Sequence, residues 1–329
     1  MLVAAVAVAV ALSGTPASVV RVVVTTGPAT KSTTAGASGR DPATSLPPAS
    51  AGSNGSFPQP AASSPLLRPG ARASFAHLVG GLPGPVAMAV APVRADGVVL
   101  LGDDAPAPGW STTKVPVLVA LLLARGSSGL TPTERQEAEL AITESDNQSI
   151  LDLFGDLETL KGGLIGASNY IQGLFRESGD DRTVVATAPP PPGAVTTFGQ
   201  TEWAPGESVK FFQALGRGCL LPPAETGYVL GLMQNIVPSE SWGLGSAGFS
   251  VPVAFKGGWG PEPSGSYLVR QSGIVDPASS RAVAVSIVAH PPPGSDSFTI
   301  GTQMITETAQ WFSRELRLLP RSGEACEVR

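Results

Sequence analysis

The sequence predicts an α+β domain in which helices flank an antiparallel sheet and a helical subdomain is inserted between its strands. Three observations lead to this class. Two short apolar segments near the start of the domain indicate a β-hairpin. A block of helical segments follows, and three more strand-like segments precede a long terminal helix. Strands and helices grouped in this way are typical of an α+β architecture. No internal repeat with a period of 20–50 residues is present.

The elements before the helical block are a helix and a hairpin. The two strands of the hairpin are rich in Val and Ala and are separated by the polar Arg-Ala-Asp segment at 94–96. The first helix of the block is apolar and ends at Gly126. The next has Pro132 in its first turn and acidic residues early, which are helix-start signals. These segments span 73–82 (helix), 85–93 and 97–102 (strands), 114–126 and 131–144 (helices).

The remaining elements complete the helical block and the sheet. A long segment with helical periodicity, an irregular proline-rich stretch and two further helices precede the late strands. The last helix is amphipathic, so one of its faces is expected to cover the sheet. These segments span 149–175, 207–218 and 223–236 (helices), 251–257, 265–276 and 282–290 (strands) and 300–319 (helix), with the helical subdomain at about 111–200.

Two segments precede this domain, which is expected to occupy residues 71–329. Residues 2–12 are apolar and are followed by small residues, so 1–24 are predicted to be a signal peptide or an N-terminal apolar anchor. Residues 25–70 are dominated by Ala, Ser, Thr, Pro and Gly and are predicted to be a disordered linker. The protein is therefore expected to be secreted or held at the cell envelope, with the N-terminus as its membrane anchor in the second case.

Composition excludes several classes of function. The net charge is −5 and no Lys/Arg run exceeds two residues, so a nucleic-acid partner is not expected. With two cysteines and two histidines, and no CxxC or HExxH spacing, neither a metal site nor a cofactor is expected. His290 ends an apolar run and is read as a strand-end residue rather than as part of a Ser-His-Asp triad. We expect a monomer.

Three short motifs occur in order along the chain. Ser111 and Lys114 open the apolar helix, Ser145-Asp146-Asn147 lies between two helices, and Lys256-Gly257-Gly258 is expected to end a strand. Each motif alone has a structural alternative: Ser111 as a helix N-cap, Ser145-Asp146-Asn147 as another cap, and Lys256 as a surface charge at the end of a strand. Together and in this order they predict a catalytic site.

The chemistry follows from the residue types. At the first turn of a helix the Ser111 hydroxyl lies at the positive end of the helix dipole. Lys114, three residues on, shares its helical face and could take the serine proton if it were neutral. Burial and the second ammonium of Lys256 would lower the Lys114 pKa. Ser145 could relay a proton to the leaving nitrogen, and the Asn147 amide could hold a substrate carbonyl or amide.

This ordered set resembles the SxxK, SDN and K-[ST]-G motifs of class A β-lactamases and penicillin-binding proteins. The resemblance covers about residues 71–320 and implies the β-lactamase/transpeptidase-like fold. It also implies an acyl-Ser111 intermediate, with an oxyanion hole formed by the backbone N–H groups of Ser111 and Trp259. Gly258 and Trp259, together with Asn147, would then bind the substrate. The implied substrate is a small-molecule or peptide-like amide, including a cell-wall peptide or a β-lactam.

The chain departs from this family in three ways. Only 34 positions separate Ser111 from Ser145, so the cleft is expected to be more open. Residues 178–200 contain no Glu, so the family's deacylating glutamate has no counterpart there. Gly257 replaces the hydroxyl residue that helps the family to bind the β-lactam carboxylate.

Four nearby residues have open roles. Arg182 could retain the structural arginine of the loop that carries the family's glutamate. Glu202 could replace that glutamate, although its position before the next helix favours a charge role at the helix start. Gln200 and Trp203 could line the cleft, or could be a loop cap and a core anchor.

The function predicted from the sequence is an exported serine hydrolase or acyltransferase with weak or no β-lactam turnover. The alternative is a non-catalytic envelope protein that keeps the fold for binding or scaffolding, and a true β-lactamase is a third reading. Cys219 and Cys326 are expected to form a disulfide, because an exported chain with two cysteines favours pairing. The alternative is two unpaired thiols.

Overall fold

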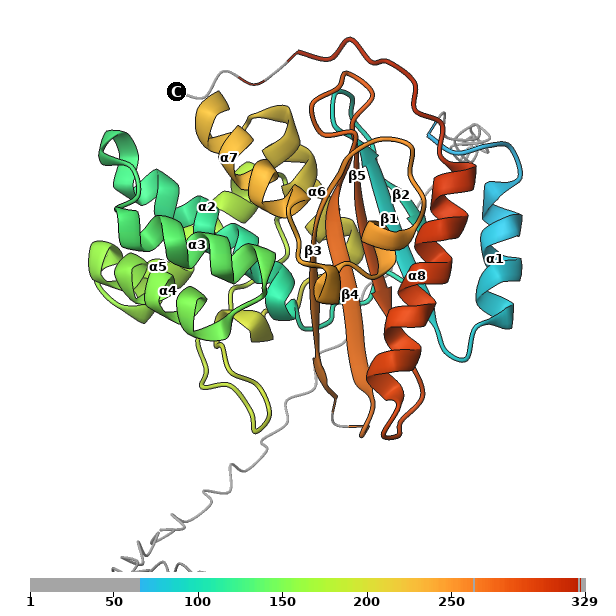
Figure 1. Ribbon diagram of the computed structural model, residues 1–329, viewed down its shortest axis with the longest axis horizontal. Helices are drawn as coiled ribbons and strands as arrows, with labels where there is room; N and C mark the ends of the chain where they lie inside the picture. Colours follow the sequence, from blue (N-terminus) through green and yellow to red (C-terminus); the bar gives the residue numbers. More distant parts are fainter. Residues whose placement is uncertain (1–65, 263, 325, 327–329) are drawn as a thin grey trace, which may run out of the picture. The chain divides into compact units, whose positions relative to one another are not determined.

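A computed structural model describes residues 66–262, 264–324 and 326 (Figure 1). The predicted signal or anchor segment at 1–24 and nearly all of the predicted linker lie outside the described residues.

One antiparallel sheet joins the early hairpin to the three late strands. Its strand order is β2-β1-β5-β4-β3, so the last strand in the chain, β5, lies at the centre and β3 lies at an edge. The pairing of Met88 with Ile287 fixes the register between the early and late parts of the chain. The strands are β1 (Val86–Pro92), β2 (Val99–Leu101), β3 (Val253–Pro261), β4 (Tyr267–Val275) and β5 (Val283–Ala289).

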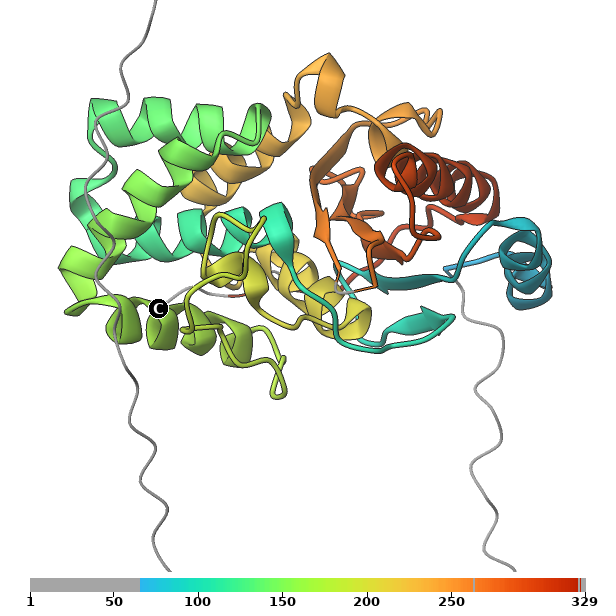
Figure 2. The same ribbon diagram turned by 90° about the horizontal axis from the view of Figure 1, so that it is seen from below.

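Helices cover both faces of the sheet (Figures 1 and 2). On one face lie α1 (Ala71–Gly81) and the long α8 (Ser297–Glu315), and on the other lies α6 (Pro205–Arg217). The helical block stands beyond α6, on the side of the sheet opposite α8. It consists of α2 (Lys114–Arg125), α3 (Pro132–Thr143), α4 (Asn147–Lys161), α5 (Leu164–Glu177) and α7 (Pro223–Gln234).

The predicted α+β class, with helices inserted between two groups of strands, is confirmed. The helical block was expected to end at about residue 200, and most of it does. However, α7 follows α6 in the chain and still packs against α2, α3 and β3. The inserted helical block is therefore interrupted in the sequence by α6, which packs on the sheet.

Two apolar cores hold these layers together. One lies between the sheet and the helical block and includes Leu118, Leu153 and Trp203, all fully buried. The other lies between the opposite face of the sheet and α8, and includes Ile287 and Phe312. The continuous apolar sequence of β5 is explained by its central position, because both of its faces are covered.

Local sequence signals set the ends of the helices that matter for the site. Thr131 and Glu134 form a capping box at the start of α3, as the early acid and Pro132 indicated. Asp146 is the N-cap of α4, where its carboxylate accepts a hydrogen bond from the Ser149 N–H at 2.7 Å. Gly126 ends α2 with a positive φ of 54°.

Two expectations about the motifs need correction. Ser111 does not open an α-helix: it lies in the 3₁₀ turn η1 (Trp110–Thr113), and α2 begins at Lys114. Gly257 does not end β3 either, because that strand continues to Pro261 and pairs with β4 over its whole length. The glycine-rich sequence suggested a strand end, but cross-strand pairing outweighs the low strand propensity of glycine.

The predicted disulfide between Cys219 and Cys326 is confirmed, with the two Cα atoms 4.7 Å apart. It joins the end of α6 to the C-terminal segment and closes a loop of 107 residues. In the chain-entropy model such a loop stabilises the fold by about 5 kcal/mol. Backbone hydrogen bonds from Arg321 to Ser280 and from Gly323 to Arg94 hold the same segment along the end of the sheet.

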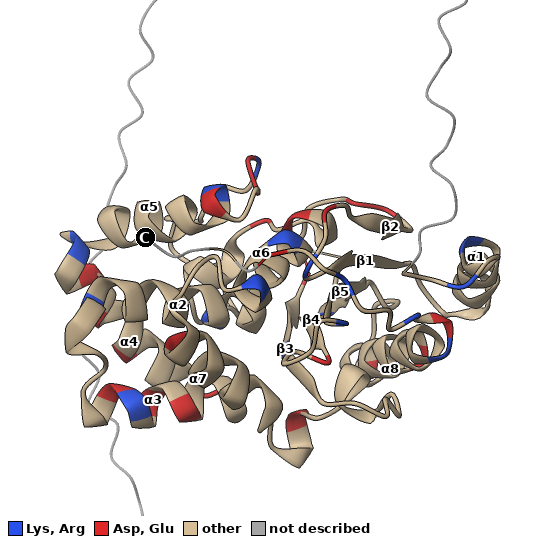
Figure 3. Ribbon diagram, turned by 90° about the horizontal axis from the view of Figure 1, so that it is seen from above, with Lys and Arg blue, Asp and Glu red and all other residues tan. Residues whose placement is uncertain are grey.

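Charge is spread over the described surface without one dominant basic side (Figure 3). Acidic and basic positions alternate around the outer helices, whereas the strands are mostly uncharged. None of the helices within residues 66–324 combines the length and apolar character that crossing a bilayer requires.

Candidate active site

Ser111 is presented by a strained turn. Trp110, immediately before it, has a φ of 46°, which is rare for a residue with a side chain. The turn packs tightly against β3: a Cβ atom at position 258 would lie 2.7 Å from the Ser111 backbone nitrogen. Only glycine allows this approach, so Gly258 fixes the distance between the candidate nucleophile and the strand.

The Ser145-Asp146-Asn147 segment divides its roles between structure and site. Asp146 caps α4, which is the structural role considered for the whole motif. Ser145 has a left-handed φ of 61°, and its carbonyl accepts a hydrogen bond from Lys114 Nζ at 2.5 Å. Asn147 Oδ1 accepts another from the same amino group at 2.9 Å. The motif therefore caps a helix and binds the candidate base.

Two buried lysines meet at Ser145. Lys114 and Lys256 are each only 1 % exposed. Lys256 Nζ donates to Ser145 Oγ at 2.8 Å, and Lys114 Nζ lies 3.5 Å from the same oxygen. The Ser145 hydroxyl thus links the two amino groups, and a proton could pass between them through it.

The environment lowers the pKa of both lysines. Burial, followed by repulsion from Lys256, lowers the pKa of Lys114 to about 6, and the charges of Asp146 and Glu240 oppose this shift. Burial lowers the pKa of Lys256 to about 8, again against the charge of Glu240. At neutral pH the site therefore holds a mostly neutral Lys114 beside a mostly charged Lys256.

Glu240 is a site residue that the sequence reading missed. It lies in the 3₁₀ turn η4 (Pro238–Glu240), and burial raises its pKa despite the two nearby lysines. Its Oε2 atom is buried and has no hydrogen-bond partner among the described residues. No sequence signal could have identified it, because it belongs to no motif and stands in an irregular segment.

A cleft of about 190 Å³ brings together residues of the first two motifs and Trp259, which directly follows the third; Gly258 itself is not part of the lining. Ser111, Ser145, Asn147 and Trp259 line it, whereas Lys114 and Lys256 lie buried behind Ser145. Its described lining contains no Asp, Glu or His side chain. The remaining walls come from Trp110, from the loop after α5 and from β3 and β4, through Gly193, Val195, Thr196, Gly260, Pro261 and Tyr267.

One expected contact is not made. Among the described residues Ser111 Oγ has no hydrogen-bond partner, and the hydrogen bonds of Lys114 Nζ go to Ser145, Asp146 and Asn147. In proteins without substrate, catalytic hydrogen bonds are often long and tighten only when the substrate binds. The candidate base is thus hydrogen-bonded to the Ser145-Asp146-Asn147 segment and not to the candidate nucleophile.

The loop after α5 is held rigidly at its start. Arg182 Nε donates to Glu207 and its NH2 group to Asp104, both at 2.8 Å, so this arginine ties the loop to α6 and to the segment before η1. Asp180 accepts a hydrogen bond from the indole N–H of Trp203 at 3.0 Å. Trp203 is completely buried and is therefore a core anchor rather than a cleft residue.

Glu202 does not reach the Ser111 cleft. With Gln200 it lines a separate cavity of about 460 Å³ beside Arg182 and Val184. Burial raises the pKa of the Glu202 carboxyl. The acid in the first turn of α6 is Glu207, so the charge role considered for Glu202 belongs to Glu207 instead.

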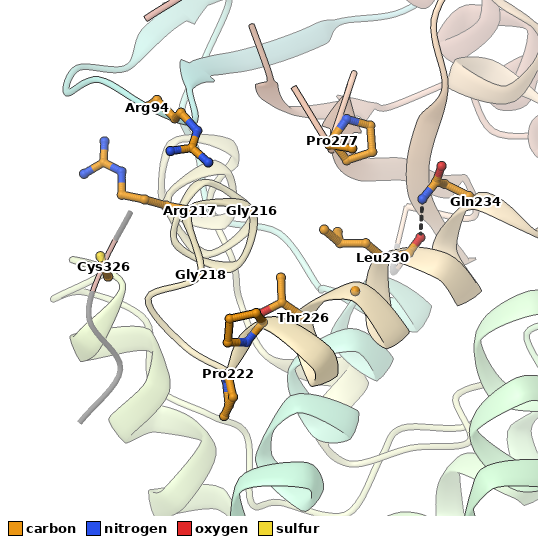
Figure 4. Close-up of a pocket in the computed structure, with 13 residues that line it drawn as sticks. Arg94, Gly216, Arg217, Gly218, Pro222, Thr226, Leu230, Gln234, Pro277 and Cys326 are labelled. Atoms are coloured by element: carbon orange, nitrogen blue, oxygen red, sulfur yellow. Dashed lines mark hydrogen bonds between the residues drawn. The ribbon is translucent and has the colours of Figure 1, made fainter. Parts of the chain in front are cut away.

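A third cavity is larger than either of these but lacks the chemistry. It measures about 900 Å³ and lies between the end of α6, the start of α7 and the turn after β4 (Figure 4). Arg94, Arg217, Leu230 and Pro277 line it, and Cys326 of the disulfide stands at its edge. None of the predicted catalytic residues lines it. Size alone does not identify the active site of this protein.

Comparison with known proteins identifies the fold. No protein-family model matches the sequence, and no curated protein matches it either. Solved structures do match: PBP-A is 19% identical, with a TM-score of 0.55 over 75% of this chain and 99% of that chain. A β-lactamase from Chitinophaga pinensis is 17% identical, with a TM-score of 0.55 over 74% of this chain and 98% of its own.

A third matching structure is a PBP-A mutant in an acyl-enzyme complex with penicillin G. It is 19% identical, with a TM-score of 0.54, and the match covers 74% of this chain and 96% of that one.

Proposed function

We propose that this chain, which has the fold shared by class A β-lactamases and PBP-A, is a serine hydrolase or acyltransferase that forms an acyl-Ser111 intermediate. One observation carries the proposal. Ser111, Ser145 and Asn147 line a single cleft, and two buried lysines meet at Ser145 directly behind it. If Ser111 and Ser145 served only in helix caps and Lys256 were only a surface charge, these side chains would have no reason to meet.

The arrangement supports a specific division of labour. Neutral Lys114 accepts the proton of Ser111 as its Oγ attacks the substrate carbonyl. The backbone N–H groups of Ser111 and Trp259 stabilise the oxyanion, with Gly258 setting the spacing between turn and strand. The proton then passes from Lys114 through the Ser145 hydroxyl to the leaving group, while charged Lys256 polarises that hydroxyl by its hydrogen bond. Asn147 orients the substrate amide.

The setting in which this reaction occurs is also a proposal. We place the protein outside the cytoplasm or at the cell envelope, on the basis of its apolar N-terminus and the Pro/Ala/Ser/Thr-rich segment that follows. The acceptor of the acyl group would then be water or an amine of the envelope.

A non-catalytic binding protein with the same fold is the second candidate. It is favoured by the missing hydrogen bond at Ser111 Oγ and by the lack of any acidic or histidine side chain in the described lining of the cleft. Against it stands the low pKa of Lys114, since a scaffold gains nothing from keeping a lysine neutral and buried.

Labelling with a fluorophosphonate probe separates these candidates. We expect intact-protein mass spectrometry to show one adduct per chain, located at Ser111 by peptide mapping. Ser111→Ala should abolish the adduct, while Ser313→Ala, on α8 and outside the cleft, should leave it unchanged. A wild-type protein that is never labelled, or a label that survives Ser111→Ala, would favour the binding protein.

The rate of Ser111 acylation should depend on pH through both lysines. Acylation requires Lys114 to be neutral, so the rate should rise as the pH passes about 6. It also requires Lys256 to be charged, so the rate should fall again above about 8. The labelling rate measured between pH 4.5 and 10 should therefore be bell-shaped. A profile that is flat from pH 5 to 7 would contradict the assignment of Lys114 as the base.

A further inference from the structure

The strand β3, which lines the cleft from Trp259 to Pro261, leaves no space for a side chain at position 257, two residues before Trp259. A Cβ atom at position 257 would lie 2.8 Å from Cζ2 of Trp242, so the indole fills the space that any side chain there would occupy. The Trp242 ring also packs edge-on against Trp259, with the ring centroids 6.3 Å apart. The Trp242 indole therefore occupies the place where a hydrogen-bonding side chain at position 257 would lie.

The neighbouring strand does not supply the missing group. Gln271 is the register partner of Gly257 and is completely buried. Its Nε2 donates to the Trp242 carbonyl at 2.8 Å, and its Oε1 accepts from the Leu244 N–H at 2.7 Å. Both ends of this amide are occupied, so it offers nothing to a substrate.

No cation of the described chain faces the cleft either. Lys256 Nζ is buried and donates hydrogen bonds to Ser145 Oγ and the Gly257 carbonyl. Arg270, paired with Gly258 across the sheet, is fully buried and donates to the carbonyls of Ala107, Pro108 and Trp203. No Lys or Arg belongs to the described lining of the cleft.

The remaining walls carry neutral side chains, both apolar and polar, and an acidic residue follows Pro261 at one end of the cleft. Trp110, Val195 and Tyr267 form the sides, and Val195 is 52% exposed although it is aliphatic. Pro261 lines the end of the cleft, and the next residue, Glu262, lies 3.1 Å from His290 Nδ1. A carboxylate entering here would lose part of its hydration without gaining a cationic partner.

We propose that the acyl donor of this site is neutral: an ester, thioester or amide with no free carboxylate beside the scissile bond. This inference depends on the proposed function, because it names the substrate class of the same cleft. For a thioester, the Ser111 Oγ–carbon bond forms and the carbon–sulfur bond breaks. The serine proton passes through Lys114 and Ser145 to the departing sulfur, leaving acyl-Ser111 and a free thiol.

A matched pair of thioesters tests the proposal. Hippuryl thioglycolate and its methyl ester have the same acyl group and the same sulfur leaving atom, and differ in one carboxylate on the leaving side. Because the two thiolates differ as leaving groups, each rate is divided by that of the same thioester with hydroxylamine in solution; we then expect the methyl ester to acylate the full-length protein at least about tenfold faster, the cost of an unpaired polar group. Thiol release and the mass of the adduct measure this rate. Equal rates, or faster acylation by the free acid, would overturn the inference.

A pair of variants tests whether the wall is the cause. Trp242→Ala alone opens the space, and Trp242→Ala with Gly257→Thr places a hydroxyl in it. The ratio of the methyl-ester rate to the free-acid rate should be several-fold lower in the double variant than in the single variant. If the ratio is unchanged in a double variant that thermal melting shows to be folded, the missing side chain at position 257 does not cause the preference for the methyl ester. If the variants do not fold, the wild-type comparison still decides.

Failure of the inference can be told apart from failure of the proposed function. If the fluorophosphonate labels Ser111 but the free acid is preferred, or if neither thioester acylates the labelled serine, only the substrate class is wrong. If the fluorophosphonate does not label Ser111 at all, the acyl-enzyme proposal itself is wrong.

Discussion

Replacing Lys114 with methionine should reduce the rate of Ser111 acylation by roughly 10²–10⁴-fold, the usual contribution of a positioned general base. Methionine approximates the length of the lysine side chain but cannot accept a proton. Lys114→Arg should not restore the rate, because a guanidinium stays protonated at any pH that the protein survives. Fluorophosphonate labelling rates of the three proteins at pH 7 provide the measurement.

The control for this substitution is another lysine of the helical block. Lys161, at the end of α4, lies over the Tyr170 ring and outside the cleft. Lys161→Met should label at the wild-type rate. Lys114→Met also removes the donor for Ser145, Asp146 and Asn147, so its melting temperature must be measured alongside. A folded Lys114→Met protein that is labelled at the wild-type rate would show that another group removes the serine proton.

Much of the fold follows from local patterns. The apolar hairpin, the capping box of α3 and the amphipathic α8 are each indicated by a short stretch of sequence, and each element forms at about the position that its pattern predicts. The order of the three motifs also predicted that they would lie close together, because a helix start, an interhelical loop and a sheet edge converge in a fold of this class. Site chemistry was therefore predictable to the extent that it depends on motif residues.

The remainder depends on contacts between distant segments. Glu240 and Trp242 lie in irregular turns with no periodic signal, yet one places a carboxyl near both lysines and the other closes the space beside Gly257. Arg270, a charged residue in a strand, is fully buried and donates to the carbonyls of three distant residues, which no local pattern indicates. Such positions are set by tertiary packing, which outweighs local propensity.

Hydrolysis of the acyl-enzyme should be slow, because the cleft lacks a base for water. The loop after α5, where the resembling enzymes carry their glutamate, contributes Gly193, Val195 and Thr196 to the lining. Glu202, the candidate substitute, lines a different cavity. Without a positioned base, attack of water on the ester should lose roughly 10²–10⁴-fold in rate. Acylation uses Lys114 and Ser145 and should not suffer equally.

A chromogenic cephalosporin in excess over protein should therefore give one equivalent of product and then almost none. The burst itself should be slow, because this substrate bears a carboxylate. The persistence of the adduct in mass spectrometry is the decisive quantity. Sustained turnover faster than about one per second would refute the prediction. If Glu202→Gln then abolished that turnover, Glu202 would be the deacylating base.

Placing a carboxylate in the cleft should restore the missing step. Val195 lines the cleft and is half exposed, so Val195→Glu can be accommodated without burying an unpaired charge. Val184, on the same loop and 67% exposed, lines the other cavity, which makes Val184→Glu the matched control. The lifetime of the acyl-enzyme should shorten by at least about tenfold in Val195→Glu and remain unchanged in Val184→Glu. Equal lifetimes in both variants would mean that access of water, rather than the absence of a base, limits hydrolysis.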